Sequence, residues 1–240
     1  GAIEVPADAL WGAQTARSLH FFAIGAQRMP VEIIHALGWI KWAAARVNCD
    51  LELLPAARAQ VIADAARRVA TGELDAQFPL SVWQTGSGTQ SNMNVNEVIA
   101  SLANQTLRSE GSTEHIHPND DVNLGQSSND AFPSAMHMAV VRLATQHLLP
   151  SLAELHETLN LQAVRFRDAI KLGRTHLQDA TPVTLGQEFG GYAAQLAMCE
   201  ASIRHALQAV HALALGGTAV GTGLNTHPQF GERVAAGLAE

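Results

Sequence analysis

Apolar residues recur at intervals of three and four along most of this chain, which is the spacing of one face of an α-helix. The first half shows this pattern over three segments of moderate length, 30–47, 55–69 and 91–109. Pro30 and Pro55 open the first two segments, as expected of proline in a first helical turn, and Gly72 follows the second. The pattern therefore predicts three helices here.

Two longer periodic segments follow. From Pro133 to about Lys171 the steps of three and four continue with one exception, beside Pro150, which predicts one kinked helix. From Thr184 to Leu215 the apolar positions approach a heptad repeat. Helices of this length are typical of bundles, and the chain around them is too short to cover them, so we expect part of a large helical assembly. A solenoid of paired helices would need a sequence repeat, and none is seen.

Alternating patterns typical of β-strands are scarce, and we expect short strands only before Trp11 and around 115–122. The predicted fold class is all-α. A mostly helical N-terminal domain is expected over residues 1–129, followed by an incomplete central helical bundle over 130–240. Both ends of the sequence look cut, because it opens without methionine and helix-forming sequence continues to its last residue.

Composition narrows the classes of protein to consider. The 240 residues are 47% hydrophobic, which excludes disorder as a description of the whole chain. The formal net charge of −7 argues against a nucleic-acid-binding surface, and no apolar run is long enough to span a membrane. Two cysteines, Cys49 and Cys199, cannot form a disulfide framework, and both are expected to be buried thiols in helices.

The loop 84–94 places glycines and small hydroxyl residues directly before a predicted helix. Backbone N–H groups at a helix N-terminus attract anions, and glycine lets the backbone approach closely, so this loop is a candidate anion site. The alternative is a polar loop in which Ser91 caps the helix.

The segment 117–130 crowds amides and hydroxyls at the entrance of the first long helix. It is a second candidate for anion binding. One alternative is a turn with a helix cap at Asp130 or Ser134. Another is a metal site, because His115 and His117 would share one side of a strand with Asp120 nearby.

The connection 173–182 carries His176. A histidine among polar groups at a helix entrance is a candidate proton carrier, although a lone histidine is more often simply hydrogen-bonded. The glycine-rich segment 215–225 lacks the lysine of a phosphate-binding loop and any strand–helix–strand context, so a nucleotide site is rejected there. Together the loops offer hydroxyls, amides and one histidine without a nucleophile–base pair. That inventory favours a small polyanionic substrate held by neutral donors, with proton transfer as the chemistry.

Long motifs in these loops resemble class II fumarases of the fumarase/aspartase superfamily. The motifs are Thr-Gly-Ser-Gly-Thr-Gln-Ser-Asn-Met-Asn-Val-Asn-Glu at 85–97, His-Pro-Asn-Asp-Asp at 117–121, Gln-Ser-Ser-Asn-Asp at 126–130, Gly-Arg-Thr-His-Leu-Gln-Asp at 173–179 and Leu-Gly-Gly-Thr-Ala-Val-Gly-Thr-Gly at 215–223. The resemblance covers the whole chain from its first residues. His176 favours fumarases, because aspartases resemble Gly-Arg-Thr-Gln at that point.

The resemblance implies reversible hydration of fumarate to L-malate without metal or cofactor, through a carbanion at C3. It also implies a homotetramer in the cytoplasm, or in the mitochondrion of a eukaryote, with active sites shared between subunits and no nucleic acid or membrane partner. His176 would be the catalytic acid/base. The substrate-binding residues would be Ser87, Thr89, Ser127, Ser128, Asn129 and Thr175. A secondary dicarboxylate site would use His117, Asn119 and Asp120.

One family element has no counterpart here. The family uses a mobile Gly-Ser-Ser-x-Met-Pro-x-Lys-x-Asn loop, which brings a proton-abstracting serine and a substrate-binding lysine, and no such stretch occurs in these 240 residues. We therefore expect a truncated or cleaved portion of a fumarase that is inactive alone. The alternatives are a related lyase, such as aspartase or argininosuccinate lyase, and a non-catalytic helical scaffold.

Overall fold

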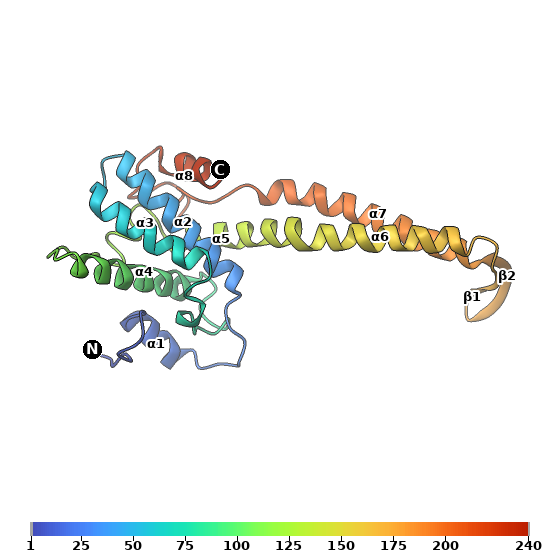
Figure 1. Cartoon of the computed structure of the whole chain (residues 1–240), viewed down its shortest axis with the longest axis horizontal. Helices are drawn as coiled ribbons and strands as arrows, with labels where there is room; N and C mark the ends of the chain where they lie inside the picture. The colour runs from blue at the N-terminus through green and yellow to red at the C-terminus, as the bar shows by residue number, and fades with distance from the viewer. Residues whose placement is uncertain (1, 240) are drawn as a thin grey trace. The chain divides into compact units, whose positions relative to one another are not determined.

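The computed structural model describes residues 2–239, and these residues are mostly helical, which confirms the all-α expectation (Figure 1). Contacts divide the chain into two compact units. The first unit extends up to Ala139 and resumes at Ala212, and the second is Val140–His211. The boundary expected after residue 129 does not coincide with this division and stays a prediction about the domains of a complete fold.

The first unit contains the three predicted helices, which are confirmed. The elements of this unit are α1 (Ala13–Phe21), α2 (Val31–Asp50), α3 (Ala56–Ala70), the short 3-10 helix η1 (Asp75–Gln77), α4 (Thr89–Ser109), most of α5 (Ser128–Leu143) and α8 (Phe230–Leu238). α2 and α3 begin directly after Pro30 and Pro55. Gly72, just beyond α3, has φ of +83°, a left-handed conformation that glycine adopts without steric cost.

The core of the first unit lies where α2, α3 and α4 pack side by side (Figure 1). Its fully buried side chains include Leu37, Ile40, Ile62, Val98 and Ile99. α2 and α3 approach closely at Gly38, where a β-carbon would come within 2.6 Å of the Ala70 backbone nitrogen. The small residues of this helix pair therefore set its spacing.

The second unit is a pair of long helices, α6 (Leu149–Arg165) and α7 (Leu185–Val210), joined by the antiparallel strands β1 (Ile170–Thr175) and β2 (Gln178–Thr184) (Figure 1). Thr184 caps α7: its hydroxyl accepts the backbone N–H of Gln187 at 3.1 Å, and the Gln187 side chain accepts the Thr184 N–H at 2.9 Å. The predicted start of this helix is confirmed. It ends at Val210, earlier than the expected Leu215.

The predicted helix 133–171 is only partly right. α5 begins at Ser128, so Pro133 lies inside the helix and does not open it. A π-helical turn, η2 (Ala144–Leu148), ends two residues before Pro150, whose missing N–H prevents one regular helical bond. α6 ends at Arg165, and Ile170 belongs to β1.

Both predicted strands are wrong, because segments 2–10 and 115–122 form turns and irregular backbone. Around Ile116 one side chain replaces a strand partner. The Asn104 amide donates to the Ile116 carbonyl at 2.9 Å and accepts its N–H at 2.8 Å. The two strands that the described chain does form meet at His176 and Leu177, whose φ angles of +49° and +63° make a tight hairpin turn without glycine.

Two smaller expectations have mixed outcomes. Cys49 is partly buried, whereas Cys199 is exposed, so the expectation of a buried thiol is wrong for Cys199. Within residues 2–239, no helix is both long and apolar enough to cross a membrane.

Candidate functional site

Two of the polar loops meet in a chain of hydroxyl groups. Within the first loop, Thr85 Oγ1 lies 3.3 Å from Ser87 Oγ, which lies 3.0 Å from Thr89 Oγ1. Thr89 Oγ1 in turn lies 2.8 Å from Ser128 Oγ of the second loop. We call Thr85, Ser87, Thr89 and Ser128 the hydroxyl cluster. Thr89 opens α4 and Ser128 opens α5, so the cluster sits at two helix N-termini.

Gly88 makes this approach possible. It precedes α4 with φ of +67°, and a β-carbon there would collide with the ring of Phe132 on α5. The alternative of a cap at Ser91 is wrong: Gly88 holds the cap position without a side-chain bond. Ser91 instead bonds Gln84, whose Oε1 accepts the Ser91 N–H at 3.0 Å and lies 3.1 Å from its hydroxyl. The Ser91 N–H is thus occupied by Gln84, and the N–H groups of Thr89 and Gln90 at the start of α4 stay available to a ligand.

The second loop is held by Asp130, whose side chain is 1% exposed. Its Oδ1 accepts the N–H of Ser127 at 2.9 Å, and its Oδ2 accepts the N–H groups of Gly216 at 3.1 Å and Thr218 at 2.9 Å. Asp130 lies within the first turn of α5, and the Ser134 hydroxyl donates to its carbonyl at 2.7 Å, so neither residue stands at the position that precedes the helix. The carboxylate joins the second loop to the glycine-rich segment.

Asn129 extends the same connection. Its side-chain amide donates to the Ala219 carbonyl at 2.8 Å, and its backbone N–H donates to the Ser127 hydroxyl at 3.2 Å. The glycine-rich segment 215–223 thus holds the Ser127–Asn129 loop in place through its hydrogen bonds with Asn129 and Asp130. Ser87, Thr89, Ser127, Ser128 and Asn129, the predicted substrate-binding residues of this unit, are brought together in one region.

Sequence reasoning missed Lys41, which lies within the apolar-periodic segment 30–47. Its side chain is fully buried, and its ammonium donates to Asn123 Oδ1 at 2.8 Å and to Gln126 Oε1 at 2.9 Å. Burial lowers the pKa of Lys41 to about 7, and the nearby Asp130 carboxylate opposes that shift. The available signal was a lysine at a core position of α2, beside a loop rich in amides.

The predicted secondary site forms one exposed turn. His117 Nδ1 accepts the backbone N–H groups of Asn119 at 3.3 Å and Asp120 at 3.2 Å, and the Asn119 amide donates to Asp120 Oδ1 at 3.2 Å. The strand that would have aligned His115 with His117 is absent. Among the residues described, no group of three or more His, Cys, Asp and Glu side chains is placed to hold a metal ion.

Thr175 and His176 belong to the second unit, where they form the end of β1 and the start of the hairpin turn. Both side chains are exposed. An ion pair of 3.0 Å between Arg174 and Asp179 closes the hairpin on either side of the turn. The left-handed conformation of His176 is costly for a non-glycine residue, and the paired strands hold it.

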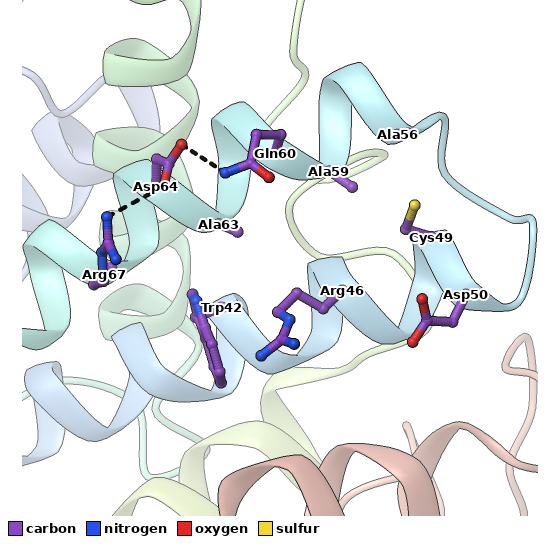
Figure 2. Close-up of a pocket in the computed structure, with 10 residues that line it drawn as sticks. All are labelled: Trp42, Arg46, Cys49, Asp50, Ala56, Ala59, Gln60, Ala63, Asp64 and Arg67. Atoms are coloured by element: carbon purple, nitrogen blue, oxygen red, sulfur yellow. Dashed lines mark hydrogen bonds and ion pairs between the residues drawn. The ribbon is translucent and has the colours of Figure 1, made fainter. Parts of the chain in front are cut away.

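A separate hollow of about 300 Å³ lies between α2 and α3 (Figure 2). Of its charged groups, Asp64 and Arg67 pair with each other. Asp64 accepts from Gln60 at 2.8 Å and from Arg67 at 3.4 Å, and the Arg46 guanidinium lies 4.5 Å from the centre of the Trp42 ring. These side chains are polar at the surface and make no converging set of donors, so we assign no ligand to this hollow.

The hydroxyl cluster has the chemistry of an anion site. It gathers hydroxyl donors at two helix N-termini, leaves them open to solvent, and lies next to a loop that a buried cation supports. Such donors stabilise negative charge that develops on a bound carboxylate.

The chain is similar to known proteins over its whole length. A family model described as a lyase matches residues 1–240. The class II fumarate hydratases of Methylorubrum extorquens and Ralstonia nicotianae are 59% and 60% identical to the chain over all of it, which corresponds to 51% and 52% of their own length. The crystal structure of a class II fumarase from Schistosoma mansoni superposes with a TM-score of 0.94 at 45% identity, over 98% of this chain and 50% of that one. The chain spans about half the length of these relatives, and it belongs to this lyase family.

Proposed function

We propose that the complete protein carrying this chain catalyses the reversible hydration of fumarate to L-malate. The observation that carries the proposal is the hydroxyl cluster, in which Ser87, Thr89 and Ser128 converge from two loops at two helix N-termini. The net charge of −7 on the chain opposes binding of a dianion. A dicarboxylate must therefore be held by many neutral donors that converge on it locally. The fumarate hydratases named above support this choice of substrate.

In this proposal Ser87, Thr89, Ser127, Ser128 and Asn129 bind the substrate carboxylates, and Thr175 assists from the hairpin. His176 acts as acid/base at the hydroxyl carbon, through a water molecule. Loss of the C3 proton from malate gives a carbanion whose charge spreads into the neighbouring carboxylate. Donors that hold that carboxylate bind the intermediate more tightly than the substrate, which is the basis of the rate enhancement.

The 240-residue chain is proposed to be inactive alone, because no stretch of it matches the Ser/Lys loop that would remove the C3 proton. His117, Asn119 and Asp120 are proposed as a secondary dicarboxylate site on the surface. We propose no metal or cofactor for the reaction, and the cytoplasm as its compartment, or the mitochondrion in a eukaryote.

A homotetramer with shared active sites is proposed for the complete protein. The second unit exposes large apolar side chains along α6 and α7, among them Leu155, Leu161, Val164 and Met198, which are 47%, 63%, 68% and 72% exposed. Apolar surface of this extent on paired long helices is typical of a bundle that other helices cover. Light scattering on the complete protein tests the assembly state, and a monomer would contradict it.

Turnover of the complete protein tests the function. We expect fumarate and L-malate to interconvert, with a change in ultraviolet absorbance as the double bond forms or is lost, and no release of ammonia from aspartate or of fumarate from argininosuccinate. Turnover of aspartate or argininosuccinate alone would assign a related lyase. No turnover of any of the three, with dicarboxylate binding also absent, would assign a non-catalytic scaffold.

A further inference from the structure

A fully buried cation supports the loop that carries half of the hydroxyl cluster. Lys41, on α2, is 0% exposed, and its ammonium donates to the side-chain oxygens of Asn123 and Gln126 at 2.8 and 2.9 Å. Gln126 is followed directly by Ser127 and Ser128. The ammonium therefore contacts the residue that directly precedes the predicted substrate-binding loop Ser127–Asn129.

The ammonium determines how these two amides are oriented. An ammonium can only donate, so the oxygens of Asn123 and Gln126 must face it and their NH₂ groups must point elsewhere. The Asn123 NH₂ donates to the Gln126 carbonyl at 3.2 Å, and the Gln126 NH₂ donates to the carbonyls of Val122 at 3.1 Å and Leu124 at 3.3 Å. Lys41 thus fixes the backbone of the turn that leads into the loop.

The contact of Lys41 with Asn123 also connects to α4, which carries Thr89 of the hydroxyl cluster. Asn123 Oδ1 also accepts the side-chain amide of Asn92 at 3.1 Å. Asn92 lies on α4, three residues after Thr89, and about one turn further along the helix. Lys41 and Asn92 share one acceptor, and this couples the α4 side of the hydroxyl cluster to the Ser127–Asn129 side.

A buried cation of this kind is costly to the fold. Its two hydrogen-bond acceptors are neutral amides, and Asp130 at the start of α5 acts on it only as a nearby charge. An apolar residue of similar volume at such a position is often neutral or stabilising for a fold. The members of the hydroxyl cluster are themselves all neutral, so Lys41 is the cation that supports the loop from the interior.

We propose that Lys41 is a positioning residue for the dicarboxylate site, which aligns the Ser127–Asn129 loop through Asn123 and Gln126 and supplies a buried positive charge that favours binding of a dianion. This rests on the proposed function, since it takes a dicarboxylate as the ligand. A charge in the protein interior is weakly screened, so it attracts a bound anion without touching it. Because the pKa of Lys41 is about 7, that attraction is present below neutral pH and declines above it.

The test measures succinate, an unreactive dicarboxylate, binding to the complete protein by calorimetry between about pH 6.5 and 8.5. Lys41→Met removes the charge and both donors, and Lys41→Gln keeps one donor group without the charge. Asn48→Ala is the matched control. Asn48 lies seven residues along the same face of α2, and its amide donates to the Leu124 carbonyl of the same turn at 3.0 Å without any charge.

We expect both Lys41 variants to bind succinate about tenfold more weakly at pH 6.5, and to lose the weakening of affinity above pH 7 that wild type shows. Their KM for fumarate should rise more than their kcat falls. Asn48→Ala should lower the unfolding temperature while it keeps the wild-type affinity and pH dependence. Any pH dependence that remains in Lys41→Met belongs to groups other than Lys41.

Affinity within about twofold of wild type in either folded Lys41 variant, at all pH values, would overturn the inference. The inference would also be overturned if the Lys41 and Asn48 variants lost the same amount of succinate affinity and kept the wild-type pH dependence. That result would mean that Lys41 only anchors the turn and that its charge plays no part in binding. Failure of both Lys41 variants to fold would assign Lys41 to stability and also overturn it. Wild-type protein that binds succinate but hydrates no fumarate would refute the proposed function, and the binding data would still decide the role of Lys41.

Discussion

Replacing Asp130 by alanine removes one acceptor that serves three backbone N–H groups. The carboxylate bonds Ser127 at 2.9 Å, Gly216 at 3.1 Å and Thr218 at 2.9 Å, and the residue is 1% exposed. The three donors lie in two segments separated by about ninety positions of sequence, and alanine offers them nothing. We therefore expect the glycine-rich segment to detach from the start of α5.

The expected loss of stability follows from these bonds. A hydrogen bond to a charged group contributes about 1.5–3 kcal/mol, and a buried donor left unpaired costs a similar amount. Taking the lower value for each of the three bonds, because two of the donors are only partly buried, gives a loss of about 4.5 kcal/mol in the free energy of unfolding. With a urea slope of about 2 kcal/mol per M, the midpoint should fall by about 2 M.

Tryptophan fluorescence during urea unfolding is the appropriate assay, because all 4 tryptophans, Trp11, Trp39, Trp42 and Trp83, lie in the first unit. Asp64→Ala is the control. That carboxylate is exposed and bonds only neighbouring side chains, so its loss should cost less than about 0.5 kcal/mol (Figure 2). A loss below about 1 kcal/mol for Asp130→Ala would refute the view that this carboxylate anchors the two segments.

Four further predictions address the site. His176→Asn in the complete protein should lower kcat by about a hundredfold or more with the assembly intact by light scattering, and a near-normal rate would remove His176 from the mechanism. His117→Asn should change kcat little in the same assay, and a collapse of turnover would exchange the roles of the two sites. Gly88→Ala should cost about 2 kcal/mol or more in urea unfolding, because φ of +67° and the Phe132 ring both oppose a β-carbon; an unchanged midpoint would contradict this. The pKa of Lys41 is lowered from 10.5 to about 7, so between these values the unfolded chain holds a proton that the folded chain has lost. Stability should therefore rise with pH in this window, by up to about 1 kcal/mol per pH unit relative to Lys41→Met, and parallel pH profiles would contradict it.

The local pattern of the sequence determined most of the helices. Prolines and periodic apolar residues placed α2 and α3 within one residue of their observed starts. The same rules failed where a local signal was ambiguous: the periodic segment starts at Pro133, but α5 begins five residues earlier. The hairpin around His176 escaped prediction because its turn contains no glycine or asparagine at the left-handed positions.

The sequence by itself also determined which residue types the candidate site holds. Glycines, hydroxyl residues and amides gather in loops just before helix N-termini, where they form recognisable motifs. Only the tertiary structure decided which of them meet. The approach of Thr89 to Ser128 depends on the contact of Gly88 with Phe132, and the support of Asn129 depends on a segment ninety residues away. The role of Lys41 was hidden for the same reason. A lysine at an apolar helical position can reach solvent or stay buried, and only the amides of Asn123 and Gln126, brought against α2 by packing, make burial of its ammonium tolerable.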